Sequence, residues 1–310
     1  MRRKAYIGVV ALAAILICAA AIIHIVRAQA FMAEAGRMAE RFAAQRLGTD
    51  VHIGTVEIRS LHELTIDDIV VYDKQADVVL RADEARVTLR LLSLLLSPET
   101  SVDEVLLTGA HAHIVQRADG SWNYNDLAAD DTEPSTFEGR IRLADATAEI
   151  ETGARSYELT DITGTADIDR GDLSYDLTAA LAGIPVRVRG ENVGGTRELQ
   201  LMLDDSELTP LLDLLPSGAI SEDVRVQKLH AAHVNASMRW VDGTFTAEGR
   251  AAGVTAAADV YGTQTQIESA ALTFSERELF LAATAEAEGE TARIDGTIRM
   301  DTDAPYLDLT

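Results

Sequence analysis

From Val51 to its end, this chain consists almost entirely of short segments in which apolar residues recur at every second position. In the clearest segment, apolar or small residues stand at 292, 294, 296, 298 and 300, and Arg293, Asp295, Thr297 and Arg299 stand between them. Similar alternation covers 87–91, 199–203 and 279–287. A period of two places alternate side chains on opposite faces of a strand, so these segments are predicted to be strands with one buried face and one wet face.

Turn signals separate these segments every 10 to 15 residues. They are Asp119-Gly120, Arg170-Gly171-Asp172, Gly194-Gly195, Asp242-Gly243 and Glu288-Gly289-Glu290. Only two stretches have helical character, namely 91–96 before Ser97-Pro98 and 208–215 before Pro216. This alternation of strands and turns predicts a mainly β fold whose strands run antiparallel.

A long sheet with one apolar face must cover that face with a second sheet, by closing into a barrel, or with an apolar partner that is not protein. The chain has only six Phe, seven Tyr and two Trp, and its apolar positions are mostly Ala, Val, Leu and Ile. This composition favours an elongated, strongly curved antiparallel sheet that forms an open apolar groove. An ordinary sandwich is the alternative. The residues that we expect to line the groove, or to fill the core of a sandwich, are Val87, Leu89, Leu177, Leu201, Leu281, Ile294 and Ile298.

The N-terminus predicts a membrane anchor. Arg2-Arg3-Lys4 precedes an apolar run from Ala5 to Val26 that is long enough, at about 1.5 Å per residue, to cross the hydrocarbon layer. The cationic start places the rest of the chain on the far side of the membrane. Residues 1–27 are therefore expected to be a transmembrane anchor, and residues 28–47 an amphipathic helix with its apolar stripe at Phe31, Ala35, Met38 and Phe42.

A cleaved secretory signal is the alternative for the N-terminus, because Ala28-Gln29-Ala30 has the small residues of a cleavage site. The apolar run is longer than is usual for such a signal, and the helical pattern continues through the site, which favours an uncleaved anchor. Cys18 lies inside the run, where we expect a small membrane-facing residue rather than a lipid attachment site.

Charge excludes one class of partner. The chain has 50 Asp and Glu against 27 Lys and Arg, a net charge of −23, and no basic cluster follows residue 4. Such a surface repels nucleic acid and anionic headgroups. Because Cys18 is the one cysteine, the part beyond the predicted anchor has neither a disulfide nor a catalytic thiol.

No catalytic constellation is evident, and we expect no enzyme activity, no cofactor and no metal. His111 and His113 would share a strand face and form half of a metal site, but no Cys or further His motif completes it. The acidic pairs Asp67-Asp68, Asp130-Asp131 and Asp204-Asp205 lack the spacing of a calcium loop, so we expect them in turns or on wet edges.

Residues 47–127 resemble the N-terminal region of the AsmA-like and TamB-like envelope proteins. The resemblance begins at Leu47-Gly48-Thr49-Asp50-Val51-His52-Ile53-Gly54, continues through 64–73, 78–87 and 102–107, and closes on Asp119-Gly120-Ser121-Trp122-Asn123. In that closing motif Asp119, Gly120, Trp122 and Asn123 are expected to have structural roles. Residues 139–310 match only as repeats of the same β type.

A polar, acidic and proline-containing stretch predicts a linker over 128–138. Together with the resemblance, it predicts a β module over 48–127 and a repeated β-groove segment over 139–310. The last residues read as a strand just beginning, so we expect the chain to be a piece of something longer.

The resemblance also implies a single-pass protein of the bacterial inner membrane, anchored by residues 5–26, with most of its length in the periplasm. Its partners would be phospholipids, whose acyl chains the groove carries toward the outer membrane. The second possibility is a scaffold for outer-membrane protein assembly, in which exposed strand edges pair with an outer-membrane barrel protein.

Overall fold

The structure is a computed structural model that describes residues 37, 40, 41, 43, 44, 47–60, 62–90, 102–127, 138–153, 155–214, 220, 221, 223–241, 244–276, 278–299 and 306–309, with backbone alone at 298, 299 and 306–309. The predicted anchor at 1–27, its Cys18, the stripe at Phe31, Ala35, Met38 and Phe42, the helical stretch 91–96, and Asp130-Asp131 lie outside the described residues.

The described chain is mainly β, as predicted, and its strands form one 16-stranded sheet. The strands are β1 (Val51–Ser60), β2 (Glu63–Tyr72), β3 (Val78–Leu89), β4 (Val102–Thr108), β5 (His111–Gln116), β6 (Glu138–Thr152), β7 (Arg155–Asp169), β8 (Asp172–Leu181), β9 (Ile184–Val193), β10 (Thr196–Glu207), β11 (Val224–Val241), β12 (Thr244–Val260), β13 (Thr263–Phe274), β14 (Glu278–Ala287), β15 (Glu290–Arg299) and β16 (Tyr306–Leu309). Two short 3-10 helices, η2 (Asn123–Leu127) and η3 (Thr209–Leu214), lie between strands, and η3 lies within the stretch 208–215 that was predicted to be helical.

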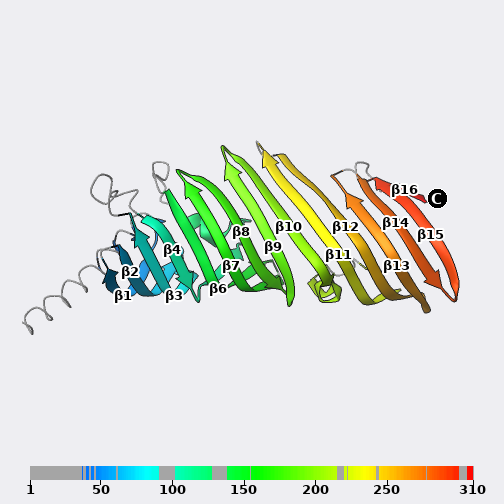
Figure 1. Ribbon diagram of the computed structural model, residues 1–310, viewed down its shortest axis with the longest axis horizontal. Coiled ribbons are helices and arrows are strands. Elements are labelled where there is room, and N and C mark those ends of the chain that lie inside the picture. Colours follow the sequence, from blue (N-terminus) through cyan, green and yellow to red (C-terminus); the bar gives the residue numbers. More distant parts are fainter. Residues whose placement is uncertain are drawn as a thin grey trace, which may run out of the picture.

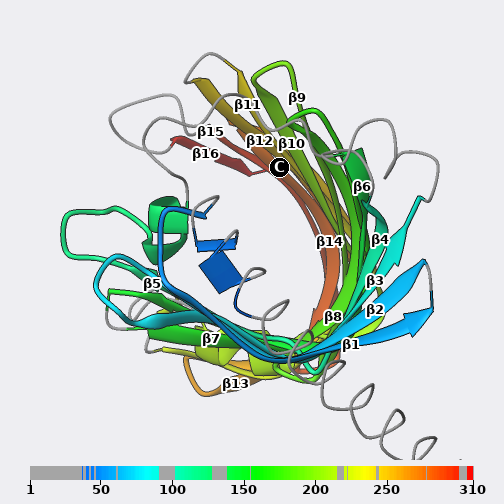
Figure 2. The same ribbon diagram turned by 90° about the vertical axis from the view of Figure 1, so that its left-hand side faces the viewer.

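The strands follow one another along the long axis of the molecule in chain order (Figure 1). Seen along that axis, the sheet is a single layer that curves like the letter C (Figure 2). We call its concave side the inner face and its convex side the outer face. The half of each strand toward the top of Figures 1 and 2 is the upper half, and the opposite half, which includes β5 (Figure 2), is the lower half.

The expectation of purely antiparallel pairing was wrong at one place. β4 and β5 are two halves of one strand path, and both pair with β6 in parallel. The chain leaves β5 at the lower end of the sheet and enters β6 at the upper end, and η2 is the described part of the crossover that a parallel pair requires. Because β6 pairs with both strands, the sheet continues without a break across the predicted linker at 128–138.

The curvature comes from a line of bends in the middle of the strands, which we call the crease. In β2, Ile66 and Ile69 both lie on the inner face, so the two residues between them, Asp67 and Asp68, both face outward. Asp68 has a positive φ of 54°, a left-handed conformation that Asp tolerates better than most residues. Three further aspartates share this conformation: Asp145 (φ 53°) in β6, Asp161 (φ 53°) in β7 and Asp205 (φ 46°) in β10.

Register aligns the bends of neighbouring strands. A Cβ added to Gly54 in β1 would lie 2.8 Å from the Asp68 Cβ, and one added to Gly109, between β4 and β5, would lie 2.3 Å from the Asp83 Oδ2. Inside the crease the two halves of the sheet converge, and the residues there are small and buried: Ala82, Ala110, Ala146, Ala231, Ala270 and Ala283. The expectation that the acidic pairs lie in turns or on edges was therefore wrong for Asp67-Asp68 and Asp204-Asp205. They bend β2 at mid-strand and β10 close to its C-terminal end.

The helical residues before the sheet protect its first edge. The Glu40 Oε1 accepts a hydrogen bond of 3.1 Å from the backbone N–H of Ile53 and lies 3.1 Å from the His52 Nδ1. Since β1 has a strand on one side only, this carboxylate satisfies a backbone donor that would otherwise be free to pair with another chain.

The crease makes a direct prediction for Asp145, which is exposed and makes no side-chain hydrogen bond to a described residue. Asp145→Val should lower the free energy of unfolding by about 1–2 kcal/mol, because a β-branched residue is strained at positive φ. Asp145→Gly should not destabilise. The matched control is Ala144→Val, on the same strand and face with an ordinary backbone. Urea unfolding followed by circular dichroism measures all three, and an equal cost for the two valines would contradict the assignment.

Candidate functional site

The inner face carries an unbroken row of apolar residues from one end of the sheet to the other. Pairing brings Leu177 beside Val188, Val188 beside Leu201, and Leu201 beside Ala236, and the same connection extends in both directions. We call the following the apolar row: Val56, Ile66, Ala85, Leu107, Leu143, Gly164, Leu177, Val188, Leu201, Ala236, Gly249, Phe274, Leu279, Ile298 and Leu307. It takes one residue from each strand on the sheet's path and contains no polar side chain. At about 4.8 Å between strands, its length is about 67 Å.

The structure places most of the predicted groove residues on this face. Leu177, Leu201 and Ile298 belong to the apolar row, and Val87 lies in the row above it, between Leu64 and Val105.

Leu281 and Ile294 pack in one cluster below the row, nearer the crease. Leu89 is half-buried at the end of β3, just beyond an irregularity in the pairing with β4. The alternating segments 199–203, 279–287 and 292–300 thus correspond to β10, β14 and β15, and their apolar positions share the concave side of the sheet.

The inner face is only partly covered by the described residues. The buried apolar side chains are mainly Ala and Val. The largest side chains that are completely buried are polar, namely Asn123 and Thr65. Leu177, Leu201 and Leu281 stay half-buried. A two-layer sandwich of this size normally buries large apolar side chains completely. Here the described strands belong to one layer, and its apolar face keeps accessible surface.

Two aromatic rings lie flat against glycines of the next strand on this face, a feature that the sequence pattern did not reveal. A Cβ on Gly190 would lie 2.3 Å from the Tyr175 ring, and one on Gly249 would lie 2.4 Å from the Phe274 ring. Burial raises the pKa of the Tyr175 phenol above its ordinary value. Each glycine thus makes room for a ring that would otherwise stand away from the sheet, and the inner face stays smooth.

The motif residues 119–123 close the lower half of the sheet next to β5. Gly120 has a φ of 84°, and the Asp119 Oδ1 accepts hydrogen bonds from the Ser121 backbone N–H (2.9 Å) and hydroxyl (2.7 Å), which lowers the pKa of Asp119. The Trp122 ring stacks on Tyr124 with centroids 6.0 Å apart. The motif is therefore a tight turn followed by an aromatic pair.

Asn123 substitutes for a missing strand. Its Oδ1 accepts a hydrogen bond from the Val115 N–H (3.0 Å), and its Nδ2 donates one to the His113 carbonyl (2.7 Å). Only the first residues of β5, His111 and Ala112, pair with β3. Without Asn123, the Val115 N–H and the His113 carbonyl would therefore be buried and unpaired. Nearby, the Arg117 guanidinium donates to Asp73 and Asp126 and holds the pKa of the Asp126 carboxyl below its usual range. These contacts tie η2 to the ends of β2 and β5.

Asn123→Ala should therefore lower the free energy of unfolding by about 1–3 kcal/mol, because two buried backbone groups lose their partners. The exposed neighbour Asn125 provides the control, since Asn125→Ala leaves those bonds in place. Thermal or urea unfolding of both variants tests this, and equal stability would show that Asn123 does not support β5.

The structure adds two carboxylates to the histidine pair on β5. His113, Glu149 and Glu151 bring their ligand atoms within 4.8 Å of one another on the outer face, and the His113 Nε2 lies 3.3 Å from the Glu151 Oε1. His111 instead contacts Thr147 at 2.8 Å. The sequence missed this cluster because Glu149 and Glu151 come from β6, which joins β5 in the unexpected parallel pair. The three residues could hold a divalent cation, although exposed carboxylates often gather without one.

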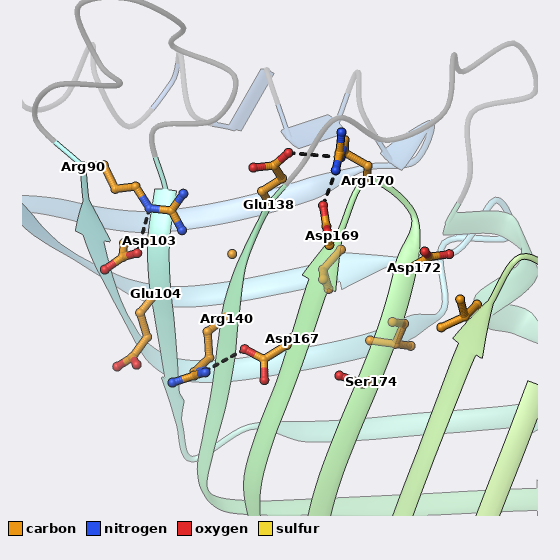
Figure 3. Close-up of a pocket in the computed structure, with 14 residues that line it drawn as sticks. Arg90, Asp103, Glu104, Glu138, Arg140, Asp167, Asp169, Arg170, Asp172 and Ser174 are labelled. Atoms are coloured by element: carbon orange, nitrogen blue, oxygen red, sulfur yellow. Dashed lines mark hydrogen bonds and ion pairs between the residues drawn. The ribbon is translucent and has the colours of Figure 1, made fainter.

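The outer face of β4, β6, β7 and β8 has a polar hollow of about 510 Å³ (Figure 3). Its arginines are already paired: Arg140 with Asp167 at 2.7 Å, Arg90 with Asp103 at 2.8 Å, and Arg170 with two carboxylates. Carboxylates outnumber arginines among the lining residues, so the hollow attracts neither anions nor apolar groups. Exposed pairs like these add little stability, and their main effect is a hydrated outer surface.

A stronger exposed pair on this face allows a pH test. Hydrogen bonds from Arg187, and then from Arg189, lower the pKa of Asp176 to about 2. Because the folded pKa lies below the unfolded one, the interaction stabilises the fold above about pH 4 and is lost as the pH falls toward 2. NMR titration of the Asp176 carboxyl should show a midpoint of about 2, which returns toward the ordinary value of 3.8 in Arg187→Gln. A midpoint unaffected by Arg187→Gln would contradict this.

Comparison with family models, with curated proteins and with solved structures finds no match to this chain. Within the part of the chain that the structure describes, no helix has both the length and the apolar character to cross a membrane.

Proposed function

We propose that this chain is an AsmA-like or TamB-like envelope protein whose concave face binds the acyl chains of phospholipids. In this proposal residues 5–26 anchor it in the bacterial inner membrane, the sheet lies in the periplasm as an open apolar groove, and lipids move along it toward the outer membrane. The observation that supports the proposal is the apolar row, which crosses the whole sheet without a polar side chain.

The energetics favour such a ligand. An acyl chain in water exposes surface that costs about 0.8 kcal/mol per CH₂, and a face of Val, Leu, Ile and Ala removes part of that cost. Neighbouring positions along the row are chemically alike, so a bound chain would meet no deep minimum and could slide from strand to strand. An extended chain of about 20 Å would span about four strands.

The two faces of the sheet differ in polarity. The inner face has the exposed apolar surface, and the outer face has the charged pairs at Arg140, Arg187 and Arg239. With a net charge of −23, the chain is kept soluble and away from anionic leaflets, which leaves the inner face as the part that meets lipid.

Photocrosslinking with paired positions tests the proposal. A photoreactive residue in place of Leu201 or Leu281 should form phospholipid adducts detectable by mass spectrometry. The adjacent outer-face residue Gln200 is the matched control and should give few, because it lies on the same strand with its side chain on the other side. If the inner positions crosslink only to protein, the lipid proposal fails. Adducts to a barrel protein from the edge strand β1 would favour the assembly scaffold instead.

A charge substitution gives an independent prediction. The double variant Leu177→Glu/Leu201→Glu should co-purify with at least about tenfold less phospholipid, because two carboxylates on the apolar row, one on each side of Val188, would have to be desolvated by each passing chain. Gln200→Glu adds the same charge to the outer face and should leave the lipid content unchanged. Phosphate analysis of the purified full-length proteins measures both, and equal lipid in all of them would contradict the proposal.

A further inference from the structure

The rim of the upper half carries a polar and aromatic row that the proposed acyl-chain function does not use. Two rows above the apolar row, pairing aligns Asn192 of β9, Arg197 of β10, Trp240 of β11 and Phe245 of β12. All four lie on the inner face, since Leu199 and Met238, which follow them toward the crease, pair with each other on that face.

Arg197 is unusual for its place. In the paired inner-face rows of β6 to β15 in the upper half, within the described residues, it is the one charged side chain. It is exposed and makes no ion pair or side-chain hydrogen bond with a described residue. The nearby carboxylate of Glu198 lies on the outer face, where it pairs with Arg239 at 2.8 Å. Among the described residues, the Arg197 guanidinium thus has no ionic or hydrogen-bonding partner, and it lies at the rim of an apolar surface.

The aromatic neighbours have the composition of a membrane interface. Trp240 and Phe245 are 36 % and 49 % exposed, and their rings contact each other with centroids 5.0 Å apart. Trp is enriched where hydrocarbon meets headgroups, because its ring is apolar and its N–H is a donor. A guanidinium binds a phosphate through two parallel hydrogen bonds, and the Asn192 amide adds a donor in the same row.

We propose that Asn192, Arg197 and Trp240 form a contact site for the phosphate of a phospholipid headgroup. This inference rests on the proposed function: the acyl chains would lie on Leu199 and Leu201 below, and the headgroup at the rim would face water. The order from rim to crease, first cationic and aromatic and then aliphatic, matches the order of groups along a phospholipid. The site orients lipids during passage, with their headgroups toward the upper rim.

The test uses the full-length protein in detergent and two phosphatidylglycerol probes, one photoreactive in the acyl chain and one in the headgroup. In the natural protein the headgroup probe should label the rim of β9 to β12, and the acyl probe should label the strands near Leu201. Arg197→Gln should reduce headgroup labelling about tenfold, as expected for the loss of a charge-assisted hydrogen bond, and leave acyl labelling in place. Arg197→Lys should retain part of it.

Arg250→Gln is the matched control, because Arg250 is exposed on the outer face of β12, two strands away from Arg197. Unchanged headgroup labelling in Arg197→Gln, with acyl labelling intact, overturns the rim site alone. If the acyl probe does not label the natural protein near Leu201, the proposed function itself is overturned. Inorganic phosphate is a third arm: if it competes with the headgroup probe at micromolar concentration, the site binds free phosphate rather than lipid.

Discussion

The structure depends on the backbone conformation at the crease. A flat sheet of this length, apolar on one side, would expose that side along its whole length and would associate with copies of itself. Positive φ at Asp68, Asp145, Asp161 and Asp205 turns two successive side chains outward and bends β2, β6, β7 and β10. The two halves then face each other across a concave surface, and alanine is the commonest buried residue on the inner side of the bend, beside Ile162 and Val254. The curvature, the small residues inside the crease and the acidic residues outside it together prevent the sheet from exposing a flat apolar face.

The inner face is uniform where the proposed function needs it to be and differentiated at its rim. Along the apolar row, residues change only among aliphatic types, one phenylalanine and glycine. On the same face, Gly190 and Gly249 let neighbouring rings lie flat. In the other direction, along β10 and β11 from the crease to the rim, the inner-face residues change from alanine through leucine to tryptophan and arginine. A surface that is constant in one direction and graded in the other favours movement along its length and fixed orientation across it.

Much of this could be predicted from the alternation of residues. Period two identified the strands β10, β14 and β15 and the face on which Leu201, Leu281 and Ile294 lie, because side-chain direction in a strand depends only on parity. The crease could not be predicted in this way, since a bend reverses parity and a pair such as Asp67-Asp68 looks like a turn in the sequence. The parallel pairing of β6 was missed for a related reason: strand order depends on a long connection, which local patterns do not encode. The contacts of Asn123, and the approach of Glu149 to His113, follow from that pairing.

Hairpin succession has a consequence for how such a sheet can change in length. From β6 to β16 every strand pairs with the next one in the chain, so each hairpin is a self-contained unit that meets its neighbours through the same backbone ladder. Inserting or deleting one hairpin would shift the reach of the molecule by about 10 Å while preserving the inward and outward sense of every other strand. The length of such a sheet can thus change in steps of one hairpin, while its cross-section stays the same.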